Sequence, residues 1–214
     1  MRVIGGRCRG MRLQSVPGTT TRPTADRVKE SLFNILAPWL ADARVLDLFA
    51  GTGALGIEAL SRGAREAVFV ERDPKALRVL RANLRHTKLE ELAEVRAGDV
   101  ARELIRLGRQ GRSFNLVFMD PPYHQGLAPP ALVSLAENGL VAPDGWVVVE
   151  HDGREEMPER AANLAKVRTV RYGDTVLAFY RPAPEYGRQT TAGAESAAGP
   201  PTQPQETGGH EGGQ

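Results

Sequence analysis

Short apolar runs rich in β-branched residues recur along the middle of the chain. Runs of this length and composition predict β-strands, and five are expected here, at residues 43–49, 67–71, 93–97, 116–120 and 146–150. Between them, apolar residues spaced three and four apart predict helices over residues 56–62, 74–86, 100–107 and 130–138. Strands that alternate with helices indicate βαβ crossovers, and therefore an α/β fold with a doubly wound, mostly parallel sheet.

The alternation stops in the last part of this pattern. Residues 166–172 and 175–180 predict two further strands, and only Gly173 and Asp174 separate them. A connection of two residues is too short for a crossover, so these strands must pair antiparallel. The sequence therefore predicts a seven-stranded sheet that ends in an antiparallel hairpin.

Another helix is predicted ahead of the first strand. Thr24 suits its N-cap and Asp26 its first turn, and the helix is expected to end near Pro38. One apolar stripe indicates that most of this helix packs against the core; it consists of Val28, Leu32, Ile35, Leu36 and Trp39. The first turns of the helix are free for a binding role, because cations and helix N–H groups there can bind a cofactor carboxylate or a phosphate. The candidates are Arg22, Thr24, Arg27 and Lys29.

Composition narrows the class of protein. A chain of 214 residues with 41% hydrophobic content is long enough for one well-filled catalytic domain. No run approaches the roughly 18 to 20 apolar residues that span a bilayer, so we expect no membrane contact and a cytoplasmic location. Cys8 is the only cysteine, which excludes an intramolecular disulfide and a thiolate zinc cluster. We expect no metal and a monomer.

The small net charge of +2 is unevenly distributed. Residues 1–30 carry seven Arg and Lys against two acids, whereas residues 183–214 carry one Arg against four Glu. A basic N-terminal arm suits nucleic acid, because phosphate contacts supply most sequence-independent affinity. It equally suits a solvated hairpin that keeps the protein soluble, and charge alone leaves both readings open. Residues 183–214, rich in Gly, Pro, Thr and Gln, are expected to be disordered.

The first strand of the alternating region leads into a glycine-rich turn, Gly-Thr-Gly-Ala-Leu-Gly at residues 51–56, with Glu71 twenty residues after Gly51. This spacing is typical of dinucleotide sites, although a glycine turn is also needed merely to pack a strand on a helix. Asp47, four residues before the turn, would repel a pyrophosphate but would attract a cation. S-adenosylmethionine, which has a sulfonium, an ammonium and no phosphate, fits this turn better than a nicotinamide cofactor.

Acidic residues at three successive strand ends suit the parts of this cofactor. Asp47 can serve the methionine end, Glu71 the two ribose hydroxyls and Asp99 the adenine amino group. Gly51 and Gly53 would let the backbone approach the cofactor closely. Each acid also has a purely structural interpretation, and Asp99 in particular suits the N-cap of the next helix. Because ligands of doubly wound sheets bind at these strand ends, the three together favour a binding site.

The fourth strand ends in Asp120-Pro121-Pro122-Tyr123. Two prolines fix the backbone and remove N–H donors, so this loop presents only acceptors. An exocyclic amine on a base could donate to Asp120 and to the Pro121 carbonyl while Tyr123 stacks on the ring. Methyl transfer would then depend mainly on positioning. The structural alternative is an aspartate turn with a packing tyrosine, and His124 is interpreted as a loop residue.

Several segments together resemble one family. They are R-V-I-G-G-R-C-R-G-M-R-L, R-P-T-A-D-R-V-K-E-S-L-F-N-I-L, V-L-D-L-F-A-G-T-G-A-L-G-I-E-A-L-S-R-G-A and F-M-D-P-P-Y. Over about residues 1–182 the chain is similar to the RsmD-like 16S ribosomal RNA guanine-N2 methyltransferases. The resemblance implies a class I methyltransferase fold, S-adenosylmethionine as cofactor, and 16S ribosomal RNA or the small ribosomal subunit as partner.

The same resemblance implies the roles of named residues. Cofactor contacts would come from Asp47, Gly51, Gly53, Glu71 and Asp99, and the amine site from Asp120, Pro121, Pro122 and Tyr123. The segment of residues 22–27, with Arg22 and Thr24, would lie over the methionine end or the incoming base. An N-terminal hairpin would touch RNA, for which the candidates are Arg7, Arg9, Arg12, Arg27 and Lys29.

The expected organisation is an N-terminal basic hairpin and helix at residues 1–40, a methyltransferase domain at residues 41–182 and a tail at residues 183–214. Two other functions stay open. An adenine-N6 DNA methyltransferase would also use Asp-Pro-Pro-Tyr, but the chain has no room for a DNA-recognition domain. A non-catalytic RNA-binding assembly factor would not need the intact Asp120 and Glu71.

Overall fold

A computed structural model describes residues 1–16 and 23–183 of the chain, and they belong to one compact unit that ends at Pro184. Arg22 and the predicted tail from residue 184 onward lie outside the described residues. The division of the compact unit at residue 40 stays a prediction. No described helix has the length and apolar character needed to cross a bilayer.

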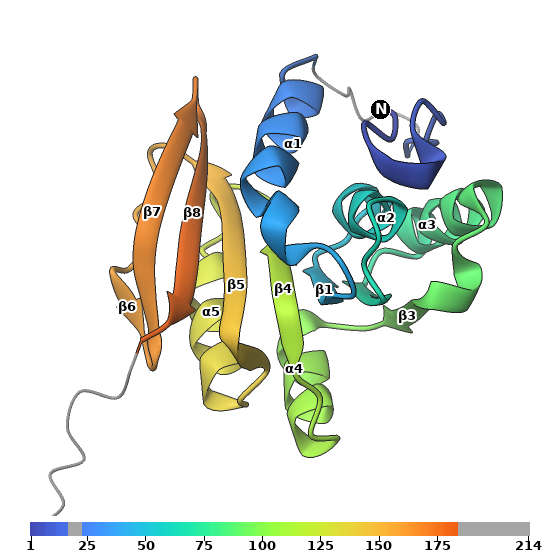
Figure 1. Ribbon diagram of the computed structural model, residues 1–214. Helices are drawn as coiled ribbons and strands as arrows, with labels where there is room; N and C mark the ends of the chain where they lie inside the picture. Colours follow the sequence, from blue (N-terminus) through green and yellow to red (C-terminus); the bar gives the residue numbers. More distant parts are fainter. Residues whose placement is uncertain (17–22, 184–214) are drawn as a thin grey trace, which may run out of the picture. The chain divides into compact units, whose positions relative to one another are not determined.

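Eight strands form one sheet in the order β3-β2-β1-β4-β5-β8-β7-β6 (Figure 1). The strands are β1 (Arg44–Leu48), β2 (Glu66–Glu71), β3 (Ala93–Ala97), β4 (Phe114–Met119), β5 (Val141–Asp152), β6 (Arg160–Ala161), β7 (Leu164–Tyr172) and β8 (Thr175–Pro182). The pairs among β1 to β5 are parallel, and β8, β7 and β6 pair antiparallel. The mostly parallel sheet with an antiparallel end is thus confirmed, and the two-residue β6 is an addition to the seven expected strands.

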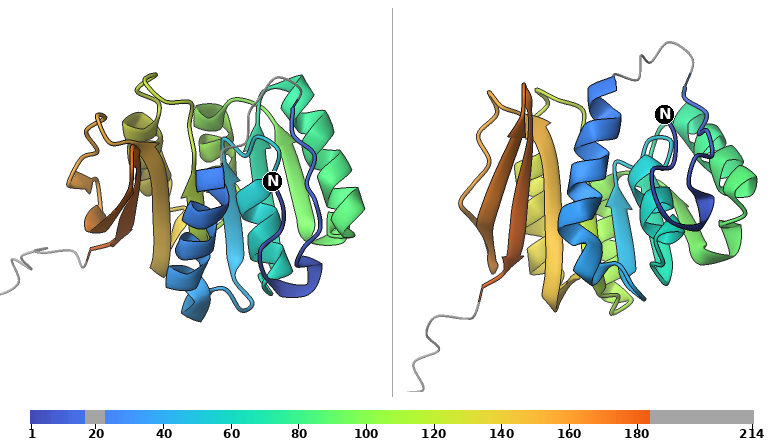
Figure 2. Two further views of the ribbon diagram at one scale, coloured as in Figure 1. Left: turned by 90° about the horizontal axis from the view of Figure 1, so that it is seen from above. Right: turned by 45° about the horizontal axis from the view of Figure 1, so that its top comes forward.

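Helices cover both faces of the sheet (Figure 2). They are α1 (Pro23–Leu36), α2 (Ala54–Ser61), α3 (Pro74–Thr87), α4 (Val100–Arg109) and α5 (Ala128–Glu137). Strand side chains alternate between two cores: in β4, Leu116 and Phe118 pack with α1, α2 and α3, whereas Val117 and Met119 pack with α4 and α5. This alternation explains why the middle strands are apolar throughout, since both of their faces are buried.

Helix α1 differs in detail from the expectation. It begins at Pro23, so Thr24 lies in its first turn rather than at the N-cap. The buried face includes Lys29 and Phe33, whereas Trp39 at the end of the predicted stripe is 37% exposed. Val28, Leu32 and Leu36 of the predicted stripe are buried as expected, whereas Trp39 lies beyond α1 in a 3-10 turn, η2 (Ala37–Trp39). Lys29 points into the protein.

The N-terminal segment, residues 1–16, is not a regular β-hairpin. A single antiparallel bridge joins Arg2 and Arg12, and a 3-10 turn, η1 (Gly6–Cys8), lies between them. Backbone hydrogen bonds also join its two arms: Val3 N–H donates to the Met11 carbonyl at 2.9 Å and Leu13 N–H to the Met1 carbonyl at 3.0 Å. The segment lies against α2 and α3 (Figures 1 and 2), whose side chains bind other parts of its backbone. The predicted hairpin is thus present as a short antiparallel pairing without regular strands, since side chains of α2 and α3 bind the N–H groups of Ile4, Gly5, Cys8 and Gln14.

Candidate active site

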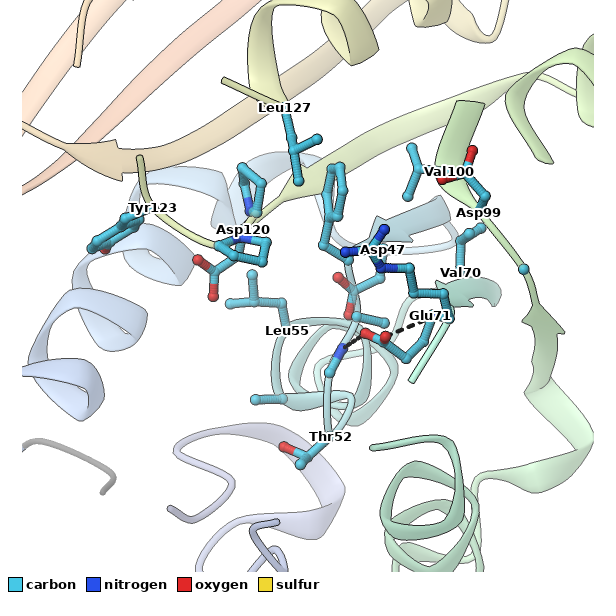
Figure 3. A pocket seen from close by; sticks show the side chains of 18 of the residues that line it. Asp47, Thr52, Leu55, Val70, Glu71, Asp99, Val100, Asp120, Tyr123 and Leu127 are labelled. Atoms are coloured by element: carbon cyan, nitrogen blue, oxygen red, sulfur yellow. Dashed lines mark hydrogen bonds between the residues drawn. The ribbon is translucent and has the colours of Figure 1, made fainter. Parts of the chain in front are cut away.

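A pocket of about 490 Å³ opens at the carboxyl ends of the parallel strands (Figure 3). Strand β1 is paired with β2 on one side and with β4 on the other, so the pocket lies where the strand order reverses, the usual ligand site of doubly wound sheets. Eight of the residues predicted for the site line it: Asp47, Gly51, Glu71, Asp99, Asp120, Pro121, Pro122 and Tyr123. The structure thus brings together residues that are spread over more than seventy positions of the sequence.

The glycine turn between β1 and α2 forms one wall. Gly53 has a φ of 84°, and a Cβ atom added there would lie 2.3 Å from Leu80 Cδ1, so only glycine allows the turn to pack on α3. Gly53 is not among the lining residues, although its neighbours Thr52 and Ala54 are, and its predicted contact with a cofactor stays a prediction. Gly51, in contrast, lines the pocket with its backbone N–H directed to Glu71.

Glu71 at the end of β2 is held by three backbone N–H groups. Oε2 accepts from Gly51 at 2.8 Å, and Oε1 accepts from Arg72 at 2.7 Å and from Asp73 at 2.8 Å. A carboxylate offers about four acceptor positions, so one stays available toward the pocket. The side chain is therefore fixed in orientation while it still accepts from a ligand hydroxyl.

Asp47 lies at the floor of the pocket and is almost fully buried. Its Oδ2 accepts from the Gly56 N–H at 2.9 Å. Burial raises the pKa of Asp47 to about 8; the Gly56 hydrogen bond opposes this rise, and the negative charge of Glu71 adds to it. A cation bound above Asp47 would restore its charged form, because opposite charges stabilise each other at short range.

Asp99 fulfils its structural role and also lines the pocket. As the N-cap of α4, its Oδ1 accepts from the N–H groups of Ala101 at 3.0 Å and Arg102 at 3.4 Å. Apolar side chains of Val70, Val100 and Leu127 line the same part of the pocket. Across Figure 3 the acids follow in the order Asp120, Asp47, Glu71 and Asp99, which is the order of the strands β4, β1, β2 and β3.

Asp120 follows β4 directly and is exposed toward the pocket. Protein atoms nevertheless crowd its carboxyl group. This burial raises the pKa of Asp120 well above its usual value, and the negative charges of Glu150 and Asp47 raise it further. Water in the open pocket limits the effect, whereas a ligand that displaces this water would strengthen it. Asp120 is thus suited to take up a proton.

Tyr123 completes the loop. Its hydroxyl donates to Glu150 Oε1 at 3.0 Å, and burial, followed by the charge of Glu150, raises its pKa, so it stays protonated. His124 is not among the lining residues: its N–H donates to Glu155 Oε1, and its Nε2 lies 3.6 Å from Asp152 Oδ2. His124 is therefore a loop residue, as the sequence indicated.

Comparisons with known proteins identify the family. Residues 1–181 match the family described as Conserved hypothetical protein 95. The ribosomal RNA small subunit methyltransferase D of Escherichia coli K12 is 37% identical over 185 residues, which cover 85% of this chain and 89% of the relative. The corresponding Haemophilus influenzae protein is 40% identical over 151 residues, or 70% and 78% of the two chains.

The chain belongs to the RsmD family. Solved structures agree: an Escherichia coli chain, 38% identical, superposes with a TM-score of 0.76 over 86% of this chain and 98% of its own. A protein from Thermus thermophilus, 35% identical, gives a TM-score of 0.74 over 85% and 99%. The family that the sequence motifs indicated is thereby confirmed.

Four of the five predicted RNA contacts of this RsmD-family protein lie on its surface. Arg7, Arg9, Arg12 and Arg27 are exposed, and none forms an ion pair within residues 1–16 and 23–183. Arg9 and Arg27 line one groove with Arg2, and Arg12 lines an adjoining groove that reaches Met1 at the edge of the main pocket. Arg12 thus lies next to the pocket and Arg9 and Arg27 one groove further out, whereas Arg7 lines none of these grooves: the next residue, Cys8, contacts Ser61 and Thr87 at the far ends of α2 and α3.

Lys29 was the fifth predicted contact, and the structure contradicts it. Lys29 is only 4% exposed, and its Nζ lies 3.2 Å from Glu58 Oε2 and donates to the Arg2 carbonyl at 2.6 Å. It holds the N-terminal segment and has no access to a phosphate. Of the other two first-turn candidates, Arg22 lies outside the described residues, and the side chain of Thr24 is not described either.

The sequence analysis missed the residues that fasten the N-terminal segment. The fully buried Glu58 of α2 accepts from the N–H groups of Ile4 at 2.8 Å and Gly5 at 2.7 Å. Asn83 of α3 accepts from Gln14 N–H at 2.8 Å and donates to the Gln14 carbonyl at 3.1 Å. The available signal was a polar side chain on the apolar face of each helix, since such a group must find a partner.

No group of three or more His, Cys, Asp and Glu within the described part of the chain is arranged to hold a metal ion. Whether the reaction proceeds without a metal stays a prediction.

Proposed function

We propose that this protein transfers a methyl group from S-adenosylmethionine to the exocyclic N2 amine of a guanine in 16S ribosomal RNA, the RNA of the small ribosomal subunit. The observation that carries the proposal is the rigid acceptor loop from Asp120 to Tyr123 at one end of an acid-lined pocket. Relatives named as small-subunit ribosomal RNA methyltransferases support the choice of substrate.

The lining of the pocket fits S-adenosylmethionine. Asp47 suits its cationic methionine end, the remaining acceptor position of Glu71 suits the ribose hydroxyls, and Asp99 with Val70 and Val100 suits the adenine. When bound, S-adenosylmethionine supplies an electrophilic methyl group on a sulfonium. Because the acids favour a cation and disfavour phosphates, the same lining argues against a dinucleotide.

The Asp-Pro-Pro-Tyr loop would hold the target base. A guanine N2 amine has two N–H donors, which the Asp120 carboxylate and the Pro121 carbonyl can accept, and the Tyr123 ring can stack on the base. This pairing directs the nitrogen lone pair into the pocket. Alignment of this kind contributes up to about 7 to 11 kcal/mol in favourable systems. The raised pKa of Asp120 also suits it to accept the proton that the amine loses.

The exposed arginines would bring the RNA to this loop. Arg9, Arg12 and Arg27 line grooves that lead from the pocket, where phosphates near a flipped guanine can contact them, and the exposed Arg7 would contact RNA further from the site. We infer that the protein acts as a monomer in the cytoplasm. Size-exclusion chromatography with light scattering would test the oligomeric state.

Nucleoside analysis of ribosomal RNA tests the proposal. Cells that lack the protein should lose N2-methylguanosine from the small-subunit RNA, and the purified protein should restore it. An Asp120→Ala variant should not restore it, although it should bind S-adenosylmethionine. An unchanged N2-methylguanosine content would contradict the proposal. Loss of N6-methyladenosine from DNA would favour the adenine enzyme, and full restoration by Asp120→Ala would favour a non-catalytic assembly factor.

A further inference from the structure

The hydroxyl of Tyr123 is tied to the antiparallel end of the sheet. It donates to Glu150 Oε1 at 3.0 Å, and the side chain of Thr175 lies nearby. Glu150 lies near the end of β5, and Thr175 is the first residue of β8. The loop after β4 is therefore fastened through the Tyr123 hydroxyl to β5, beside the start of β8.

Strand register explains why Glu150 can reach this ring. Met119 of β4 pairs with Val149 of β5 in parallel, so the next residues, Asp120 after the end of β4 and Glu150 within β5, lie at the same level of the sheet. Glu150 in turn pairs with Leu177 of β8 in an antiparallel ladder, which fixes its position. A half-buried carboxylate is thus held beside the proposed amine site although it does not line the pocket.

We propose that Glu150 is a positioning residue for methyl transfer, which acts by holding the Tyr123 ring in the orientation that receives the target base. This inference rests on the proposed function, since it takes the target amine to bind at Asp120. The family resemblance assigns Tyr123 a place at the target base, but it gives no role to Glu150 or to the antiparallel end of the sheet.

The geometry favours this role over simple packing. Tyr123 is only half-buried and follows two prolines, so neighbouring side chains enclose its ring incompletely. A tyrosine ring that can rotate in a half-open site has several rotamers, and only some of them stack on the base. The hydrogen bond to a charged acceptor selects one of them before the substrate arrives. Such preorganisation increases kcat more than it changes substrate binding.

Three variants separate the hydrogen bond from the ring and from the charge. Tyr123→Phe keeps the ring and removes the hydroxyl, Glu150→Leu removes the acceptor, and Glu150→Gln keeps an acceptor oxygen without the charge. We expect Tyr123→Phe and Glu150→Leu each to lower kcat by about 10- to 100-fold, and the double variant to fall no further. Glu150→Gln should recover most of the activity. The exposed Glu156, changed to Leu, is the matched control.

The pH profile gives a readout that a packing role would not change. Asp120 faces Glu150 from β5, Asp47 from β1 and the Tyr123 phenol from its own loop. The charge of Glu150 helps to raise the pKa of Asp120, so its removal lowers that pKa. In Glu150→Gln the acid limb of the rate profile should therefore shift to lower pH, whereas in Glu156→Leu it should stay in place.

The measurement is the initial rate of methyl transfer to small ribosomal subunits, with S-adenosylmethionine affinity and circular dichroism recorded for every variant. Intact folding and cofactor affinity together with non-additive losses support the inference. Losses that multiply in the double variant, or a Glu150→Leu variant as active as the wild type, overturn it while the proposed function stands. A wild-type protein that methylates no ribosomal RNA overturns both.

Discussion

Replacement of Glu58 by Ala should release the N-terminal segment from the rest of the protein. This carboxylate is fully buried, and four groups depend on it: the N–H groups of Ile4 and Gly5, the Lys29 ammonium at 3.2 Å and the Arg62 guanidinium at 2.8 Å. Lys29 is itself buried, so the variant leaves a cation in the interior without its carboxylate. The variant thus removes two backbone contacts of this segment and also the ion pair of Lys29, which binds the Arg2 carbonyl.

The expected size of the effect follows from these contacts. Removal of one partner from a buried ion pair costs about 3 to 5 kcal/mol, and each buried N–H left without an acceptor adds about 1 to 3 kcal/mol. Release of the segment to solvent limits the total, because freed groups regain water. We therefore expect the free energy of unfolding to fall by about 3 to 5 kcal/mol, equivalent to a decrease in Tm of about 6 to 20 °C for a chain of this size.

Chemical denaturation followed by fluorescence measures the loss, and hydrogen exchange locates it. Amides of the N-terminal segment should lose protection first, whereas those of β1 and β4 should keep theirs. Glu137→Ala, at an exposed helix position, is the control and should change stability by less than about 0.5 kcal/mol. A Glu58→Ala protein within about 1 kcal/mol of the wild type would refute the reasoning.

Three further predictions concern binding and pH. Replacement of Arg7, Arg9 and Arg12 by Ala should weaken RNA binding, and the slope of log affinity against log salt should decrease by about 0.7 to 0.9 for each lost phosphate contact. Titrations should show unchanged S-adenosylmethionine affinity. Equal slopes for the variant and the wild type would contradict an RNA contact. Glu71→Ala should weaken S-adenosylmethionine binding by about 10- to 100-fold in calorimetry, since the ribose loses its charged acceptor. Because the pKa of Asp47 is raised to about 8, the folded state holds its proton more firmly, so this group's stabilisation is lost as pH rises from about 4 toward 8. The free energy of unfolding, measured by denaturation between about pH 5 and 9, should fall with pH in the wild type by up to about 1.4 kcal/mol per pH unit more than in Asp47→Asn. Parallel curves of stability against pH for the two proteins would contradict a raised pKa of Asp47.

The features that were predictable from the sequence are those with local causes. Buried parallel strands are apolar on both faces, so β1, β2 and β4 could be recognised from their own residues. The acids of the site could be placed because each lies at or near the carboxyl end of a predicted strand, and parallel strands end at the same edge of the sheet. The antiparallel end could be predicted from Gly173 and Asp174 alone, because a two-residue connection permits no other pairing.

The features that were missed depend on partners distant in sequence. Ile4 and Glu58 are 54 positions apart, and Gln14 and Asn83 are 69 apart, so no local pattern relates them. The two arms of the N-terminal segment pair only briefly, and several of its N–H groups bind side chains of α2 and α3 instead. Lys29 was assigned to RNA by its charge, although Phe33 and Leu36, four and seven positions later, lie on the same buried face. An ion pair with a buried carboxylate overrides the expectation that a lysine is exposed.

These distant contacts also connect the basic segment to the cofactor pocket. Asn83 Nδ2 donates both to the Gln14 carbonyl and to the Thr52 carbonyl at 3.0 Å, and Thr52 belongs to the glycine turn. One α3 side chain therefore fixes the segment that carries Arg7, Arg9 and Arg12 and the turn that positions Gly51 against Glu71. A ligand that orders the turn also stabilises the surface on which the arginines lie. Affinity for the cofactor and affinity for RNA should then be linked, and linkage requires the effect to be equal in both directions.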